Sequence, residues 1–253
     1  MERMDTVRIP VPETTRIVAH RGLSGLETEN TTAAFLAAGN RAGIDGIETD
    51  IRRTADGQFV LFHDDTSLRL AGDEFSIGGC TLETLRAVSL KDRCTGRKRP
   101  DLRIATPEEY IGICKKYGKF CYAELKDDFA AAEIRRIVEL FEKEDYLDHT
   151  VFLSFFYGGC LKLRTMLPQQ KIQFLTEDVS DELIDHLQKD RLDIDILHTR
   201  LTEERVQAMH RAGITVNVWV ADNADDAGRL IRWGVDAITT NLLEAERNGC
   251  SQF

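Results

Sequence analysis

The sequence predicts an α/β fold, namely a TIM (β/α)8 barrel of eight parallel strands with helices between them. Apolar, β-branched segments alternate with amphipathic segments along most of the 253 residues, a pattern typical of parallel strands joined by helical crossovers. The length fits because such a barrel commonly takes roughly 250 residues. One connection is too short for a helical crossover, so the strand after it must run antiparallel. Without that strand eight candidate strands remain, which is the number that closes a TIM barrel.

Nine segments have the composition and length of strands. They are residues 16–20, 46–51, 59–63, 120–125, 150–155, 171–176, 195–199, 214–220 and 236–240. Six of the segments between or after them have the periodicity of helices, several opening on Ser, Thr or Asn and closing on Gly. These are residues 31–43, 129–147, 157–168, 180–191, 202–213 and 223–234.

The second and third strands are predicted to form an antiparallel hairpin. Only residues 52–58 separate them, and these include Asp56-Gly57, a type I′ turn signal. If the turn is centred between those two residues, Asp50 lies opposite His63 and Glu48 lies opposite Asp65. The hairpin then brings carboxylates and an imidazole into one neighbourhood.

Residues 64–119 are too long for a plain connection between a strand and a helix. They contain one clear helical segment at 106–118 and a weaker one at 81–89. We interpret residues from about 64 to 105 as a small insertion before the strand that carries Glu124. The whole chain, residues 1–253, is then one barrel domain.

The charge balance argues against a nucleic-acid partner. Asp and Glu number 43 against 33 Lys and Arg, a formal net charge of -10, so the surface as a whole should repel a polyanion. No apolar stretch is long enough for a transmembrane helix, and the first residues lack the apolar core of a signal peptide. A cytoplasmic protein is expected if Met1 is the natural start. The oligomeric state is not indicated.

Polar residues cluster where the predicted strands end, which in a barrel is the catalytic face. Glu48 and Asp50 end the second strand on one face, and Glu124 ends the strand after the insertion. Three carboxylates in one barrel mouth need a compensating charge, and hard oxygen ligands suit Mg²⁺ or Ca²⁺. The sequence therefore predicts a divalent cation.

Two histidines and two cationic side chains complete this set. His20 and His63 are imidazoles that could take and give a proton near neutral pH, with either one in either role. Arg21 and Lys126 could hold an anionic substrate oxygen. Each residue taken alone also has a structural explanation, but together they indicate phosphoryl chemistry.

At this point the sequence resembles the glycerophosphodiester phosphodiesterase family. The most specific block is residues 27–70, in which the ENT, E-x-D, DG and HD elements follow HRG at the family's spacing. The full set of matching segments is 17–22 (IVAHRG), 27–70, 122–126 (YAELK), 153–155 (LSF), 216–223 (VNVWVADN) and 234–241 (GVDAITTN). They occur in the family's order over nearly the whole chain.

The resemblance implies a metal-dependent enzyme that hydrolyses glycerophosphodiesters to sn-glycerol 3-phosphate and an alcohol. It implies that His20 and His63 are the acid and base, that Glu48, Asp50 and Glu124 hold the metal, and that Arg21 and Lys126 bind phosphate. Trp219 would pack against the glycerol or line its pocket, and Glu29 and Asn30 would support the first loop. Asn30 could equally be a helix N-cap. Asn241 departs from the family's pattern, where an Asp is common.

Two other functions are compatible with the same residues. A phospholipase-D-like member of the superfamily would release the head group of a lysophospholipid or sphingomyelin and leave a cyclic phosphate. A catalytically silent barrel would only bind its ligand, since one fold can serve many functions. The head group that an active enzyme would prefer is not encoded in a recognisable motif.

Overall fold

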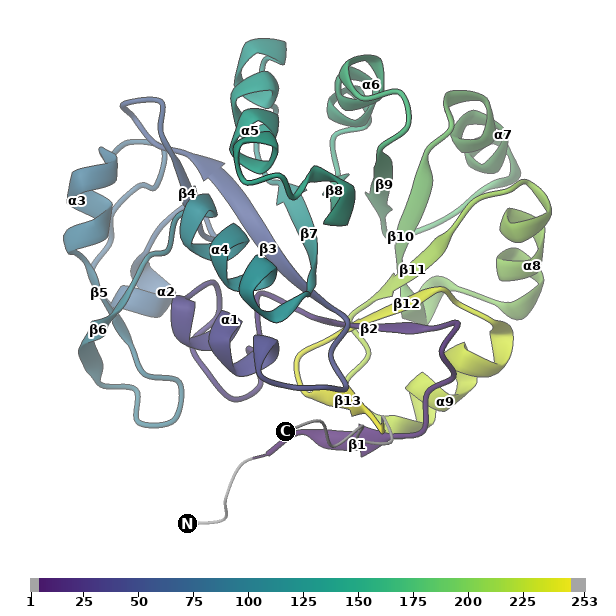
Figure 1. Cartoon of the computed structure of the whole chain (residues 1–253), viewed down its shortest axis with the longest axis horizontal. Coiled ribbons are helices and arrows are strands. Elements are labelled where there is room, and N and C mark those ends of the chain that lie inside the picture. Colours follow the sequence, from purple (N-terminus) through teal and green to yellow (C-terminus); the bar gives the residue numbers. More distant parts are fainter. Residues whose placement is uncertain (1–4, 247–253) are drawn as a thin grey trace.

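The computed structural model describes residues 5–246, and its centre is a closed barrel of eight parallel strands (Figure 1). Neighbouring strands follow the order β2, β3, β7, β8, β9, β10, β11 and β12, and β12 pairs with β2 to close the ring. Their bounds are β2 Arg16–Ala19, β3 Gly46–Arg53, β7 Phe120–Leu125, β8 Thr150–Ser154, β9 Lys171–Thr176, β10 Asp193–Leu197, β11 Val216–Trp219 and β12 Ala237–Thr240. The predicted TIM barrel is confirmed.

Helices connect successive barrel strands and lie around the ring. Their bounds are α1 Thr32–Gly39, α4 Pro107–Tyr117, α5 Ala131–Lys143, α6 Tyr157–Met166, α7 Asp181–Asp190, α8 Glu203–Arg211 and α9 Ala224–Trp233. Two short 3-10 turns, η1 Leu147–His149 and η2 His198–Arg200, precede β8 and follow β10. The Thr31 hydroxyl accepts a hydrogen bond from the Ala34 N–H and caps α1. The interpretation of Asn30 as the N-cap was therefore wrong by one residue.

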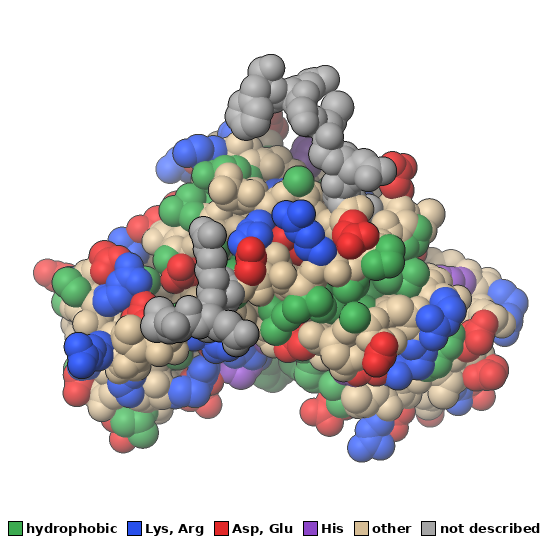
Figure 2. All heavy atoms as spheres, turned by 90° about the horizontal axis from the view of Figure 1, so that it is seen from below, with side chains coloured by type: hydrophobic (Ala, Val, Ile, Leu, Met, Phe, Trp, Pro, Cys, Tyr) green, Lys and Arg blue, Asp and Glu red, His purple; other side chains and the backbone are tan. Residues whose placement is uncertain are grey.

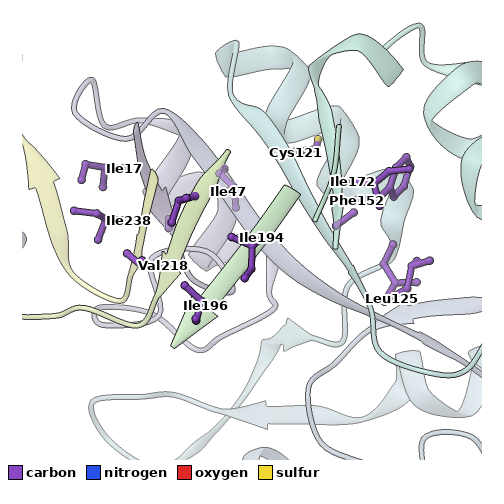
Figure 3. Packing of buried hydrophobic residues seen from close by; sticks show 14 of the residues in the cluster. Ile17, Ile47, Cys121, Leu125, Phe152, Ile172, Ile194, Ile196, Val218 and Ile238 are labelled. Atoms are coloured by element: carbon purple, nitrogen blue, oxygen red, sulfur yellow. The ribbon is translucent and has the colours of Figure 1, made fainter. Parts of the chain in front are cut away.

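Residues of each barrel strand alternate between two apolar environments. Outward residues such as Ile17, Ile194 and Ile196 pack beneath the surrounding helices in the main core (Figure 3). Inward residues such as Leu153 and Leu175 form a smaller cluster inside the ring. The inward positions nearest the carboxyl ends of the strands form the mouth of the barrel.

The predicted hairpin is present, but its register differs by one residue from the expected one. β4 (Phe59–Leu61) pairs antiparallel with β3, and Ile51 lies opposite Leu61. Thr54 and Gln58 close a three-residue loop that ends at Gly57 with φ 72°, a left-handed conformation that favours glycine. The expected two-residue turn placed His63 opposite Asp50; the structure places Phe62 there, with its N–H bonded to the Asp50 carbonyl.

The insertion packs on the outer side of this hairpin. It contains α2 (Leu68–Ala71), α3 (Leu82–Ala87) and an antiparallel pair, β5 (Ser89–Lys91) with β6 (Lys98–Arg103). Val60 and Phe62 face these elements in a separate buried cluster, whereas Phe59 and Leu61 face the main core. The weak helix at 81–89 is confirmed, but the β5–β6 pair was not predicted because its residues are largely polar and exposed.

A second unpredicted pair lies outside the ring. β1 (Val7–Ile9) and β13 (Leu243–Ala245) run parallel, side by side (Figure 1), and their buried residues join the main core. Within residues 5–246 no helix is long and apolar enough to cross a membrane. Figure 2 shows one face of the molecule, on which basic and acidic side chains are interspersed.

Candidate active site

A cavity of about 150 Å³ lies at the mouth of the barrel and contains most of the predicted site residues. Its lining residues are His20, Arg21, Glu48, His63, Glu124, Lys126, Leu153, Phe155, Leu175, Asp195, Trp219 and Thr239. They lie on or directly after all eight barrel strands and in the segment after β4. The structure therefore brings together histidines, carboxylates and cations that range from His20, after the first barrel strand, to Asp195 on the sixth.

The three predicted carboxylates form one compact, buried cluster. Glu48, Asp50 and Glu124 each offer an oxygen within 4.8 Å of the others, and they are 4%, 1% and 7% exposed. Burial, with the neighbouring carboxylates, raises the pKa of Glu48 well above its ordinary value and that of Glu124 to about 8. A divalent cation would relieve this repulsion, so the donor set fits an oxygen-ligated metal.

The two predicted cations lie directly against this cluster. The Arg21 backbone N–H donates to the Glu48 carboxylate at 2.7 Å, and its Nε lies 3.4 Å from the Asp50 Oδ2. The Lys126 Nζ lies 2.9 Å from Glu124 and 3.6 Å from Asp50. Burial favours the neutral acid, but Arg21 and Lys126 together lower the pKa of Asp50 to about 2. Of the three carboxylates, Asp50 therefore remains deprotonated to the lowest pH.

His20 is held by a chain of hydrogen bonds that starts at the end of β12. Its Nδ1 lies 2.9 Å from the Asn241 Oδ1, and the Asn241 amide donates to the Asp222 carboxylate at 2.6 Å. Because the amide nitrogen faces Asp222, the amide oxygen faces His20, and the imidazole carries its proton on Nδ1. Burial and the charge of Arg21 lower the pKa of His20 to about 4. The Nε2 atom is thus an unprotonated base.

His63 has a different partner on the other side of the cavity. Its Nδ1 lies 2.9 Å from Asp64, whose other oxygen accepts from the Arg69 Nε at 2.7 Å. Burial lowers the pKa of His63, but the carboxylates of Asp50 and Asp64 act against that shift. His63 is also the more exposed imidazole, with 32% of its side chain accessible. These surroundings favour a protonated imidazole more than those of His20 do.

Glu29 and Asn30 support the site from the loop after β2. Glu29 accepts hydrogen bonds from both Arg21 and Arg69. The Asn30 amide donates to the Asp50 Oδ2 at 2.7 Å, and its backbone N–H bonds the Arg21 carbonyl. Arg21 and Asn30 both have a φ of 54°, a strained conformation that these contacts hold in place.

The far side of the cavity is mainly apolar. The Trp219 and Phe155 rings meet edge to face, with centroids 5.8 Å apart. The Trp219 indole N–H donates to the Asp195 carbonyl at 3.2 Å, which fixes the ring at the mouth. Trp219 therefore lines the cavity, and the ammonium of Lys126 lies 5.6 Å from the Phe155 ring centre.

Several residues of this site were not assigned a role from the sequence. Arg69 comes from the insertion, and no local motif connects it with Glu29. Asp222 precedes β12 and Asn241 follows it. The sequence marked Asn241 only as a departure from the family's pattern and gave no sign of Asp222. Asp195 could have been found, because it is an inward acidic residue between the outward residues Ile194 and Ile196.

A second cavity, of about 220 Å³, lies between the loop after β2 and the insertion. Its lining residues are Ser24, Glu27, Thr28, Glu29, Arg69, Leu70, Lys91, Asp92, Arg93 and Gly96. Arg69 of the insertion bonds Glu29 of the loop, and Glu29 also bonds Arg21, which lines the first cavity. The insertion therefore contributes one wall of a recess beside the mouth.

Comparison with known proteins shows the family to which this chain belongs. Residues 20–245 match the model of the glycerophosphoryl diester phosphodiesterase family. The chain belongs to this family. Its members are phosphoric diester hydrolases, and the match includes every residue that the sequence predicted for the site.

Curated family members resemble the chain over nearly its whole length. A glycerophosphodiester phosphodiesterase of Caldanaerobacter subterraneus subsp. tengcongensis is 25% identical, and the alignment covers 93% of this chain and 99% of that protein. A protein of the same name from Bacillus altitudinis is 26% identical over 90% of this chain and 95% of the relative.

Solved structures of the family have the same barrel. An Oleispira antarctica phosphodiesterase in complex with its product sn-glycerol-3-phosphate has a TM-score of 0.82 and 25% identity, covering 91% of this chain and 93% of that one. A Silicibacter pomeroyi structure at 22% identity has a TM-score of 0.80 and covers 92% of each chain, which supports the fold.

Proposed function

We propose that this glycerophosphodiester phosphodiesterase family member hydrolyses glycerophosphodiesters to sn-glycerol 3-phosphate and an alcohol, and that it needs a divalent cation. The observation that carries the proposal is the cavity at the barrel mouth, where a buried acidic cluster faces two imidazoles and two cations. The product bound to the Oleispira antarctica relative supports the choice of substrate class.

The cation would be held by Glu48, Asp50 and Glu124. Their buried oxygens converge within 4.8 Å, and such oxygen donors suit Mg²⁺ and Ca²⁺ alike. When bound, the ion supplies Lewis-acid polarisation of a phosphoryl oxygen. Asn30, which donates to Asp50, orients one of the ligands.

Arg21 and Lys126 hold the phosphodiester beside the cluster. Both lie against Asp50, so their positive charges are already oriented toward the place where an anionic substrate oxygen would bind. Fixed charges of this kind stabilise the additional negative charge at phosphorus in the transition state. Glu29 keeps Arg21 in position through its salt bridge of 2.8 Å.

His20 acts as the base and His63 as the acid. The Nε2 of His20 is unprotonated because Asn241 holds the proton on Nδ1, so it can accept a proton from water or from the glycerol 2-hydroxyl. That oxygen forms a new bond to phosphorus as the bond to the head-group alcohol breaks. Attack by water gives sn-glycerol 3-phosphate directly, whereas attack by the 2-hydroxyl gives a cyclic phosphate, which a water molecule then opens to sn-glycerol 3-phosphate. His63, with Asp64 behind it, gives its proton to the departing alcohol oxygen.

Release of sn-glycerol 3-phosphate tests this proposal. Purified protein treated with EDTA is supplied with glycerophosphocholine or glycerophosphoethanolamine and then, separately, with Mg²⁺, Ca²⁺ or Mn²⁺. We expect release to stop on chelation and to return with at least one cation. Phosphorus NMR identifies the product: a persistent cyclic phosphate would support the phospholipase-D-like alternative. Binding without turnover under every cation would support the silent barrel.

A further inference from the structure

One acidic residue lines the same cavity without a role in the mechanism above. Asp195 lies on the inward face of β10 and is 3% exposed. Its Oδ1 atom has no hydrogen-bond partner among residues 5–246. Burial alone raises the pKa of Asp195 to about 8, because no charge or hydrogen bond offsets it. Buried polar groups in folded proteins are nearly always paired.

The neighbouring inward side chains explain why the Asp195 Oδ1 is unpaired among residues 5–246. In register beside it are Leu175 on β9 and Asn217 on β11. Leu175 has no polar atom in its side chain, and the Asn217 amide donates to the Gln173 Oε1 at 3.0 Å. A carboxyl group left unpaired in this way destabilises the fold, so its presence on the cavity wall points to a ligand that pairs with it.

The position of Asp195 determines which part of a ligand it can contact. In the ring of eight strands, β10 is four strands from β3, so Asp195 lies across the barrel from Glu48 and Asp50. Leu175 and Trp219 form the apolar wall on its side of the cavity. A diester whose phosphate is bound at Arg21 and Lys126 can therefore extend one of its two alcohol groups across the cavity to Asp195.

We propose that Asp195 hydrogen-bonds the terminal hydroxyl of the substrate's glycerol and makes the site select glycerophosphodiesters over diesters that lack this hydroxyl. This inference rests on the proposed function. A hydroxyl can both donate and accept, so it pairs with a carboxylate or a carboxylic acid. A site built around such a contact discriminates against the analogue without the hydroxyl, since binding of that analogue leaves a buried group unpaired.

The test compares two substrates on the intact protein. They are sn-glycero-3-phosphocholine and the phosphocholine diester of propane-1,2-diol, which lacks only the terminal hydroxyl. The wild type should prefer the glycerol substrate by roughly 10- to 100-fold in kcat/KM. Equal kcat/KM values for the two substrates would overturn the inference before any variant is made.

Two variants and a control locate the effect. Asp195→Leu should lower kcat/KM for the glycerol substrate by the same factor and leave the analogue nearly unchanged. Asp195→Asn, which keeps polar atoms at the site, should lower kcat/KM for the glycerol substrate less than Asp195→Leu does. The control Val151→Ala changes an apolar residue inside the ring that does not line the cavity and should leave the preference intact. Equal losses on both substrates in Asp195→Leu and Asp195→Asn would show a merely structural role and overturn the inference.

Failure of the proposed function would give a different pattern. A wild type that cleaves no glycerophosphodiester with any cation contradicts the hydrolase activity without testing Asp195. Calorimetry that measures the affinities for sn-glycerol 3-phosphate and for propane-1,2-diol phosphate then tests the Asp195 contact without turnover. Tighter binding of the first by the wild type, lost in Asp195→Leu, supports the contact. Equal affinity for the two phosphates overturns it.

Discussion

The two sides of the barrel mouth differ in chemistry. The side formed by β2, β3, β7 and the segment after β4 carries His20, Arg21, Glu48, Asp50, His63, Glu124 and Lys126. The side formed by β8 to β12 carries Leu153, Phe155, Leu175, Trp219 and Thr239, with Asp195 as its one acidic lining residue among those described. Charge is thus concentrated on one half of the ring.

This difference separates two tasks. A cation and a phosphodiester need clustered charges, and burial strengthens each interaction among them. The apolar half adds shape and excludes water, so it affects which substrate binds more than how fast the bond breaks. Substitutions on the charged side should therefore lower kcat, whereas those on the apolar side should change KM or substrate preference.

The largest effect is expected from the histidines. His20→Ala and His63→Ala should each lower turnover by roughly two to four orders of magnitude, while the exposed His186→Ala should not. A glycerophosphodiester with p-nitrophenol as leaving group needs no proton at departure, so it should restore much of the rate of His63→Ala and little of that of His20→Ala. The reverse pattern in steady-state rates would exchange the two roles.

Loss of a carboxylate from the proposed ligand set should come next. Glu124→Gln keeps the size of the side chain but removes a negative charge from the cluster, and we expect turnover to fall by roughly 10²- to 10³-fold. The cation concentration needed for half-maximal rate should rise at the same time. Full activity at the wild-type cation concentration would remove Glu124 from the ligand set.

The acidic cluster should also make stability depend on pH. The pKa of Glu124 rises from 4.5 in the unfolded chain to about 8 in the fold, so its contribution is present below pH 4.5 and is lost as the pH rises toward 8. The chelated protein should lose on the order of a few kcal/mol over that window.

Thermal melting with EDTA or with excess Mg²⁺ or Ca²⁺ checks this prediction. The stabilisation by the cation should grow from pH 5 to pH 8, because the cation binds the deprotonated carboxylates. Asp195, whose pKa is raised too, should contribute equally with and without the cation, so the difference isolates the cluster. A constant difference across this range would contradict the expectation.

On the apolar side a smaller effect is expected. Trp219→Ala removes the ring that meets Phe155 and should raise KM by roughly 10-fold with little change in kcat, since the lost contact is equal in ground and transition states. Steady-state kinetics with glycerophosphocholine measure the two constants. A fall in kcat with unchanged KM would place Trp219 among the groups that act in the transition state.

The smallest effect concerns the second cavity. Lys91→Ser and Arg93→Ser alter the insertion's wall of the recess and should change the ratio of kcat/KM for glycerophosphocholine and glycerophosphoethanolamine by a few fold, roughly the effect of a surface charge. Leu68→Ser, an exposed change on the same insertion, is the control. An unchanged ratio would assign head-group choice to another part of the mouth.

Much of this arrangement could be predicted from the sequence because it depends on repeating patterns. Apolar, β-branched runs between amphipathic segments located all eight barrel strands, and the polar residues at their ends indicated the mouth. β10 spans Asp193–Leu197 rather than the predicted 195–199, because the charged Asp193 interrupts the apolar run at its start and His198 and Thr199 belong to the 3-10 turn that follows. Inward carboxylates are a signal that apolar periodicity does not detect.

The features that could not be predicted from the sequence depend on exact backbone geometry or on contacts between residues that are distant in the chain. The hairpin register changed by one because a left-handed Gly57 ends a three-residue loop. Arg69 reaches Glu29 across forty residues, and only the packing of the insertion brings the two together. Asn241 bonds His20 after the chain has completed the ring.

The separate buried cluster beneath the insertion has an evolutionary consequence. Because Val60 and Phe62 anchor the insertion on the outer face of β4, insertion residues other than Asp64 and Arg69, which contact His63 and Glu29, can vary in length and charge without disturbing the inward carboxylates and imidazoles. The same reaction centre can then be combined with different neighbouring recesses. A lineage of such barrels could diversify in the alcohols it releases while the machinery that breaks the phosphate ester is inherited intact.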